Sequence, residues 1–386
     1  MTVYAAGQQP PAQEPPRFRT GVDIVLLDTS VVDRDGKPVG GLTPADFQVT
    51  VNGSNRRVVS AEFINHLEAA AATTAAIAKA AAAPSDAAAL PAAPLDAGRN
   101  LLIVFDEDSL ETENGLVARR AAGALLDGLS PLDRVGVNLI PRPRGNFTLT
   151  TDRSENRLAL LRWVPGTNRE LPGRYWIGES EAIQIARMDQ IALDNVALRE
   201  CPPKDQICRR EVAADAKAQA MRTAVRASQT FEALRELGRG LQKVAGPKVL
   251  VLISGGMSRP DTSGLFDDLA KEFAAAEITL YSLFLERPAS AMVRYRPSPT
   301  QIDDDRLGQF ELGNVTSVVG GTFLHVIGQV EPQFRRIATE LSSSYVLGIE
   351  VDAADRDGRP HEVSIKVNRR GLDVRGRRQY VIPAVK

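Results

Sequence analysis

Residues 101–106 read LLIVFD, an unbroken run of apolar side chains that ends in an aspartate and leads into the acidic stretch EDS. A strand buried on both faces carries such a run, because helices cover both sides of a parallel sheet. The segment KVLVLISGG (248–256) has the same character and stops at two glycines. Both runs therefore predict interior strands of a parallel sheet.

Strand-like and helix-like segments alternate around these two runs, which is typical of an α/β domain. We expect a doubly wound, mostly parallel six-stranded sheet, with residues 146–150 as an antiparallel edge strand. The other expected strands are 133–140, 278–284 and 321–326, and the expected helices are 113–128, 152–164, 179–200, 210–244, 264–276 and 331–344.

The two ends of the chain have a different period. Apolar and polar residues alternate in several short runs of residues 18–66, around the turn Asn52-Gly53, and again in residues 345–386. This period indicates antiparallel strands joined by tight turns. Each group is too small to be stable by itself. Pairing the two groups would bury both apolar faces, so we expect a small split antiparallel β-sandwich into which the α/β domain is inserted.

Composition shifts suggest the domain boundaries. The N-terminal segment is rich in Pro and Gln, which is typical of a disordered tether, and a later stretch is mostly Ala with three prolines, as in a linker. The predicted divisions are a tether at 1–17, the β-domain at 18–66 and 345–386, a linker at 67–98, and the α/β domain at 99–344 with a long helical insertion at 179–244.

Composition also limits the partners. The 386 residues are 43% hydrophobic and 25% charged, which is typical of a globular protein. The net charge is −1, from 47 Lys and Arg against 48 Asp and Glu, so no nucleic-acid partner is predicted. We interpret the Arg-rich run at 369–378 as a solvated strand face, with a ligand patch as the alternative. No stretch approaches the roughly 20 apolar residues of a transmembrane helix.

Cys201 and Cys208 enclose the sequence PPKDQI between two expected helices. The spacing is too long for CxxC redox chemistry, and no histidine accompanies the pair to form a zinc site. We predict a disulfide, which persists outside a reducing cytosol. The N-terminus lacks a signal peptide but is similar to the sequence that follows one, with small residues before a Pro-rich tether. We therefore expect an extracytoplasmic protein, periplasmic or secreted, whose export signal is absent from this chain.

Six segments carry a resemblance to a known family: VDIVLLDTSVVDRDGKPVGGLTPADFQVTVNG, LLIVFDEDS, SPLDRVGVNLI, LTTDRSENRLALL, KVLVLISGG and SSSYVLGIEV. Together they resemble the von Willebrand factor A-type (vWA) domain, and specifically the vWA-related proteins common in acidobacterial genomes, from about Phe18 to Val381. The resemblance implies a vWA or Rossmann-like fold and an exported protein, and it assigns no activity.

In vWA domains a Mg²⁺-type site lies beyond the carboxyl ends of the strands, with the signature Asp-x-Ser-x-Ser after the first strand. The resemblance places Asp106 at the first position. Asp108 stands where the first serine is expected, and Leu110, which cannot bind a cation, stands at the second. Ser109 is adjacent to the required position and offers a hydroxyl.

Later loops of the vWA site normally supply a Thr and an Asp. Thr167 is the candidate for the first, and Ser254 stands where the second is expected. The resemblance therefore implies a degenerate metal-ion-dependent adhesion site, with Mg²⁺, Ca²⁺ or Mn²⁺ as a possible cofactor and no cofactor as the alternative. In that alternative the acids of residues 106–108 serve only the N-terminus of the following helix, where the helix dipole favours negative charge.

Tyr175 and Trp176 lie in the loop expected beside this site. An exposed aromatic pair would be a natural anchor for a protein partner, and packing against the long helices is the alternative. Glu107 is the other residue that we expect to contact a partner.

We predict no catalytic residues. The histidines His66, His325 and His361 lie in different elements, and Ser254 lacks the first glycine of a G-x-S-x-G nucleophile motif. We expect a non-enzymatic, adhesion- or scaffold-like protein-interaction module that uses the carboxyl-end face of the sheet. The alternatives are a structural or assembly component that binds through its helical insertion without a metal, and a hydrolase that uses Ser254.

Overall fold

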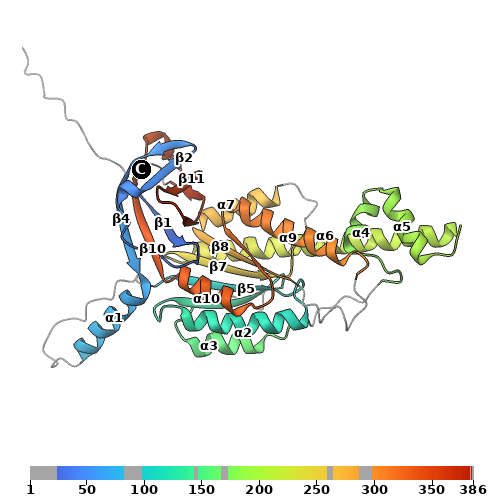
Figure 1. The fold of residues 1–386 in the computed structure, drawn as a ribbon, viewed down its shortest axis with the longest axis horizontal. Helices are drawn as coiled ribbons and strands as arrows, with labels where there is room; N and C mark the ends of the chain where they lie inside the picture. The colour runs from blue at the N-terminus through green and yellow to red at the C-terminus, as the bar shows by residue number, and fades with distance from the viewer. Residues whose placement is uncertain are drawn as a thin grey trace, which may run out of the picture.

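The structure is a computed structural model that describes residues 24–81, 98–142, 147–166, 173–258, 264–286, 298–382 and 384. The predicted tether at 1–17, most of the predicted linker and Thr167 lie outside these ranges. Figure 1 shows antiparallel sheets at one end, a layered α/β body in the middle, and a helical extension at the other end.

Five parallel strands form the central sheet in the order β6-β5-β7-β8-β9. They are β5 (Asn100–Asp106), β6 (Arg134–Ile140), β7 (Lys248–Ser254), β8 (Ile278–Leu285) and β9 (Thr322–Val326). Every residue of β5 and β7 is buried. The prediction that these two apolar runs form interior strands of a parallel sheet is therefore confirmed.

The described residues form five strands in this sheet, whereas six were expected. Among residues 147–150, the described part of the expected edge strand, Thr150 alone pairs with the sheet, through one antiparallel bridge to Val135. Phe147 and Leu149 pack against the hydrophobic cluster on one face of the sheet. Side-chain packing, rather than a ladder of backbone hydrogen bonds, therefore holds this segment.

Helices cover both faces of the sheet, as the doubly wound arrangement requires (Figure 1). One face is covered by α2 (Thr112–Gly128), α3 (Arg153–Arg162) and α10 (Glu331–Glu340). The other face is covered by α6 (Gln206–Gln242), α7 (Leu265–Ala275) and α9 (Gln301–Val318). No helix in the described ranges combines the length and apolarity that crossing a bilayer requires.

Strands from both ends of the chain pair with one another in two antiparallel sheets. One sheet has the order β12-β1-β10-β4 and the other β13-β11-β2-β3. A single hydrophobic cluster contains residues of both sheets, among them Leu27, Val49 and Tyr345. The elements of this part are β1 (Ile24–Asp33), η1 (Pro44–Asp46), β2 (Phe47–Val51), β3 (Ser54–Arg56), β4 (Val58–Asn65), α1 (His66–Ala81), β10 (Ser343–Glu350), η2 (Ala353–Asp355), β11 (Pro360–Val367), β12 (Leu372–Gly376) and β13 (Gln379–Val381).

The helical extension consists of α4 (Glu179–Ala186), α5 (Gln190–Glu200) and the first part of α6. Where one helix was expected over 179–200, two form, because Met188 adopts a positive φ of 69° and the Asp189 side chain caps the next helix. The extension has its own hydrophobic cluster, which includes Ile185, Val196 and Val212. It is a packed unit rather than a loop.

The predicted disulfide is confirmed. Cys201 and Cys208 are bonded, and the bond joins the end of α5 to the start of α6. The Asp205 side chain accepts hydrogen bonds from the backbone N–H groups of Ile207 and Cys208 and so caps α6. The cap and the covalent bond together close the tip of the extension.

Candidate functional site

The order of the parallel strands reverses at β5. The chain passes from β5 to β6 on one side and then crosses to β7 on the other side of β5. In open α/β sheets, such a reversal leaves a crevice at the carboxyl ends of the two strands, and ligands bind there. Asp106 ends β5 and Ser254 ends β7, so both residues lie at this crevice.

A cavity of about 380 Å³ lies at this edge of the sheet. Its walls come from the loop after β5, the loop after β7, the middle of α6 and the start of α9. The lining residues used below are Asp106, Glu107, Asp108, Ser109, Leu110, Glu111, Glu179, Thr223, Arg226, Gly255, Gly256, Ser258, Asp304, Asp305 and Gly308.

Hydrogen bonds join the two strand ends at the base of the cavity. The Ser254 hydroxyl donates to the Asp106 carboxylate at 2.9 Å, and the Ser109 and Ser254 hydroxyl oxygens lie 3.0 Å apart. The Ser109 oxygen also accepts a hydrogen bond from the Gly255 backbone N–H at 2.9 Å. The structure thus brings together three of the residues that the vWA resemblance indicated.

The carboxyl group of Asp106 is only 3% exposed. Burial raises the pKa of Asp106 to about 7, against the opposing effect of the hydrogen bonds from Ser254 and Ser109. At neutral pH this carboxyl is therefore partly protonated, and the hydroxyls around it stabilise its ionised form.

The neighbouring residues of the β5 loop have other roles. The Asp108 carboxylate pairs with the Arg142 guanidinium at 3.0 Å. Glu107 lines the cavity although most of its surface is buried. Leu110 is 3% exposed and belongs to the hydrophobic cluster on the α2 side of the sheet. Leu110, the residue at the third position of the Asp-x-Ser-x-Ser signature, therefore packs in the hydrophobic core.

Glycine is required where the loops meet. A Cβ on Gly255 would collide with the Ser109 carbonyl oxygen. Gly256 has a φ of 123°, which L side chains rarely adopt, and its backbone lies against Gly308 of α9. The glycine pair after β7, visible in the sequence, thus allows the β5 loop, the β7 loop and α9 to converge on one cavity.

Two residues from distant segments are not predicted from the sequence as part of this site, and the acidic run at 303–305 indicates only a solvated loop, with calcium binding as the alternative. Arg226 of α6 lines the cavity, and its charge acts on Asp106. The Asp304 carboxylate of α9 accepts hydrogen bonds from the backbone N–H groups of Glu179 (3.2 Å) and Ser180 (2.8 Å), and so caps α4. No local motif marks either residue, because both act on parts of the chain that only the fold brings near.

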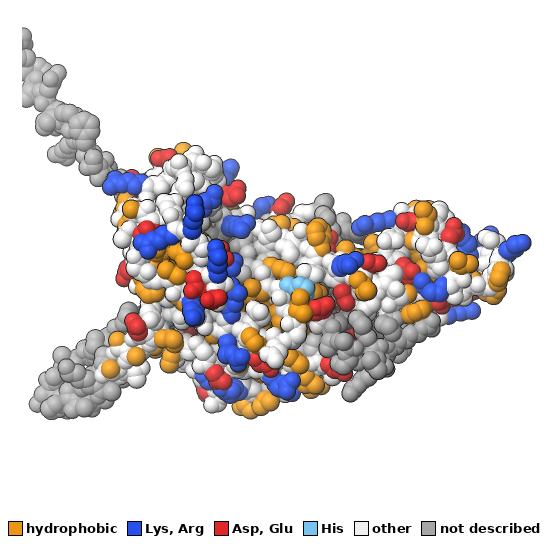
Figure 2. Space-filling model, in the orientation of Figure 1, with side chains coloured by type: hydrophobic (Ala, Val, Ile, Leu, Met, Phe, Trp, Pro, Cys, Tyr) orange, Lys and Arg blue, Asp and Glu red, His pale blue; other side chains and the backbone are white. Residues whose placement is uncertain are grey.

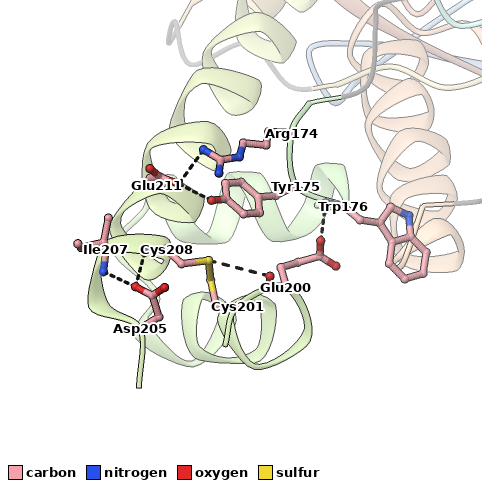
Figure 3. Close-up of a disulfide and its surroundings, with 9 residues drawn as sticks. All are labelled: Arg174, Tyr175, Trp176, Glu200, Cys201, Asp205, Ile207, Cys208 and Glu211. Atoms are coloured by element: carbon pink, nitrogen blue, oxygen red, sulfur yellow. Dashed lines mark hydrogen bonds and ion pairs between the residues drawn. A yellow bond between two sulfur atoms is a disulfide. The ribbon is translucent and has the colours of Figure 1, made fainter. Parts of the chain in front are cut away.

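Tyr175 and Trp176 are absent from the described lining of the cavity. The Tyr175 hydroxyl donates to Glu211 of α6 at 2.5 Å, and the Trp176 backbone N–H donates to Glu200 of α5 at 3.1 Å (Figure 3). Both side chains are half-buried. The structure places the pair on the helical extension, and their role as partner anchors stays a prediction.

The residues of the cavity fit a Mg²⁺ site poorly. Mg²⁺ requires nearly octahedral oxygen ligands and binds through carboxylates. Here Asp106 is engaged by Ser254, Asp108 by Arg142, and the third position is the buried Leu110. Among the described residues, no group of three or more His, Cys, Asp or Glu is arranged to hold a metal ion. Thr167 lies outside the described residues.

Comparison with known proteins finds similarity to solved structures. No protein-family model matches the sequence, and no curated protein matches it. The similar solved structures include vWA domains.

Three of these structures differ in how much of each chain the similarity covers. Proximal thread matrix protein 1 from the mussel byssus is 12% identical, covers 65% of this chain and 48% of its own, and has a TM-score of 0.33. The SpRpn10 VWA domain is 10% identical over 61% of this chain and 93% of its own, with a TM-score of 0.29. A von Willebrand factor type A protein from Catenulispora acidiphila is 9% identical over 94% and 75%, with a TM-score of 0.33. The chain spans about half the length of the mussel protein.

Proposed function

We propose that this chain is a non-enzymatic protein-interaction module that acts outside the cytoplasm and binds its partner in the cavity beyond β5 and β7. The observation that carries the proposal is the position of this cavity at the reversal of strand order, where α/β proteins bind ligands. The disulfide between Cys201 and Cys208 supports the compartment, because such bonds persist in oxidising surroundings.

The charge of the cavity indicates the chemistry of the partner. Among the described residues of the lining, acidic side chains come from the β5 loop, α4 and α9. They outnumber the basic side chains of the same lining, which Arg226 supplies. Such a surface attracts positive charge and repels negative charge, which gives specificity and fast association. We propose that the partner presents a basic segment.

The same geometry supports a role without catalysis and without a metal. The histidines that the structure describes, His66, His325 and His361, do not line the cavity. The Ser254 hydroxyl contacts the Asp106 carboxylate and, at 3.0 Å, the Gly256 carbonyl oxygen, and the Ser254 side chain is fully buried. A nucleophilic serine must be able to reach its substrate. We therefore propose that Ser254 replaces the metal-binding aspartate by stabilising Asp106 directly.

Labelled peptides test the proposal by fluorescence anisotropy. An Arg- and Lys-rich peptide should bind in a salt-dependent manner, whereas a Glu-rich peptide of the same length should not. The double variant Glu111→Gln/Asp305→Asn should weaken binding by roughly five- to tenfold. Asp373→Asn, a single neutralisation on β12, should leave it unchanged. Equal binding of both peptides, or equal loss with Asp373→Asn, would refute the cavity as the binding site.

A second candidate function is supported by the helical extension. Ile191 and Leu198 of α5 and Ile207 of α6 are apolar yet 74%, 86% and 71% exposed. They lie on a unit that projects from the body and is closed by the disulfide (Figure 1). A contiguous patch of exposed apolar side chains marks a docking surface, and we propose that these three side chains contribute to one, which would favour an assembly component.

Site-specific photo-crosslinking separates the two functions. A crosslinking amino acid is placed at Glu111 of the cavity, at Leu198 of the extension, or at the exposed Leu161 of α3 as a control. A discrete adduct from position 111 that basic peptide displaces supports the cavity. An adduct from position 198 alone supports the extension.

A further inference from the structure

A second pocket lies at the opposite end of the parallel sheet. It has a volume of about 60 Å³ and lies where the amino ends of β7 and β8 meet the antiparallel sheet that contains β1, β10 and β12. Lys and Arg side chains gather on the visible face near this junction (Figure 2). The pocket is separate from the acidic cavity and independent of the proposed function.

Arg377 lines this pocket and is buried, with an exposure of 7%. Its guanidinium lies over the Tyr380 ring, 4.1 Å from the centroid, and its Nη2 atom lies 3.9 Å from the Asp28 carboxylate. Its Nη1 atom is buried and has no hydrogen-bond partner among the described residues. A buried charged donor without a partner is costly, so a partner is expected in the pocket.

Two more residues that line the same pocket each carry a buried nitrogen atom without a hydrogen-bond partner among the described residues. Arg375 Nε and His66 Nδ1 are buried, and no described residue bonds to them. Arg375 uses Nη2 to contact Asp373 at 3.3 Å, and His66 uses Nε2 to contact Ser344 at 3.0 Å. Residues from two separate segments of the chain that each carry an unsatisfied nitrogen atom therefore line one small pocket.

Each acidic side chain near the pocket is either bound to a basic side chain or opposed by a nearby positive charge. Asp133 is bound to Arg99, which also lines the pocket, at 2.8 Å. Asp28 and Glu277 line the pocket as well, opposed by Lys248, Arg375 and Arg377. Arg375 is likewise paired with Asp373, so the charges of the lining balance once the Arg99–Asp133 and Arg375–Asp373 pairs are set aside. The case for an anion rather than water therefore depends on the buried Arg377 guanidinium, whose Nη1 atom has no partner among the described residues.

We propose that this junction pocket binds a small inorganic anion of about the size of chloride, held by the side chains of Arg377 and Arg375. The volume corresponds to about two water molecules, which suits such an ion. Because Arg377 lies between β12 and β13 while Lys248 begins β7, the bound ion would join the antiparallel sheets to the α/β body.

Bromide diffraction tests the site directly. Crystals of the full chain grown in sodium bromide should show an anomalous peak within hydrogen-bonding distance of Arg377 Nη1. Water alone at that position overturns the proposal. This measurement uses the wild-type chain and therefore decides the question even if a variant fails to fold.

Thermal unfolding supplies the second test. At equal ionic strength, chloride should raise the Tm in a saturable way by about 1–3 °C over gluconate, an anion too large for the pocket. Arg377→Gln should abolish this difference, and Arg378→Gln, which neutralises the exposed neighbour, should keep it. The same Tm in both salts, or the same loss in both variants, overturns the proposal.

Discussion

The Ser254 hydroxyl donates a hydrogen bond of 2.9 Å to the Asp106 carboxylate, and this bond joins the ends of two neighbouring parallel strands. The same hydroxyl group contacts Ser109 and accepts a hydrogen bond from the Gly256 backbone N–H. The buried acid at the base of the cavity is therefore held by neutral donors. The stability of this strand junction therefore depends on those donors.

Replacing Ser254 by Ala should lower the free energy of unfolding by about 1–3 kcal/mol, because a buried carboxyl group loses its donor. Urea denaturation monitored by circular dichroism measures the change. Ser317→Ala, which removes an exposed hydroxyl from α9, should change the stability by less than about 0.5 kcal/mol. A Ser254→Ala variant as stable as the wild type would show that the hydrogen bond contributes little.

Isothermal titration calorimetry with Mg²⁺, Mn²⁺ and Ca²⁺ should show no micromolar binding to the wild-type chain. The reason is that Leu110 lies in the core, Arg142 neutralises Asp108, and the acidic side chains that the structure describes are not grouped around a common point as a hard cation requires. Micromolar binding that is lost in Asp106→Ala would contradict this expectation and would restore the metal-dependent interpretation.

His66 makes the stability of the fold depend on pH. Burial and the nearby Arg99 charge lower the pKa of His66 to about 4, with an opposing effect of Asp133. The unfolded chain binds a proton near pH 6.5 and the folded chain only near pH 4, so stability falls as the pH decreases through this window. The loss amounts to at most about 3 kcal/mol.

The variant His66→Gln isolates this effect. Urea denaturation at several values between pH 7 and pH 4 should show a smaller loss of stability in the variant than in the wild type. His325→Gln is the control, because His325 lies at another edge of the molecule, on β9. Parallel curves for wild type and His66→Gln would rule out His66 as the group responsible.

Removing the disulfide should loosen the tip of the helical extension and leave the body intact. The bond closes a short loop, so the double variant Cys201→Ser/Cys208→Ser should lose roughly 2–3 kcal/mol of local stability. Hydrogen exchange followed by mass spectrometry should show faster exchange in α5 and the start of α6, with unchanged exchange in β5 and β7. Uniformly faster exchange would mean that the extension and the body unfold together.

Reading the sequence predicted the parallel sheet well, because burial on both faces demands an unbroken apolar run and β5 and β7 both carry one. The edge segment that ends at Thr150 was harder to predict. Its residues have the composition of a strand, but their side chains pack into the core of one face and the backbone pairs only once. The composition of a segment does not show whether side-chain packing or backbone pairing attaches it to the sheet.

The candidate site was predictable only in part. Asp106 and Ser109 follow an interior strand, and their position at the carboxyl edge of the sheet follows from that strand alone. Arg226 and Asp304 belong to long helices whose local patterns contain no sign of a cavity. Likewise, Tyr175 and Trp176 lie in a loop that is expected beside the site, yet they contact the helical extension.

The amino-acid sequence by itself determined the period of each segment, the interior strand that ends in Asp106, and the Cys201–Cys208 pair, because these depend on local burial and short-range spacing. The tertiary structure decided which charges share a space: it brought Arg226 near Asp106 and Arg377 near the start of β7. Electrostatic interactions act through distance in space, and two residues far apart in the chain come within that distance only after the sheets and helices have packed.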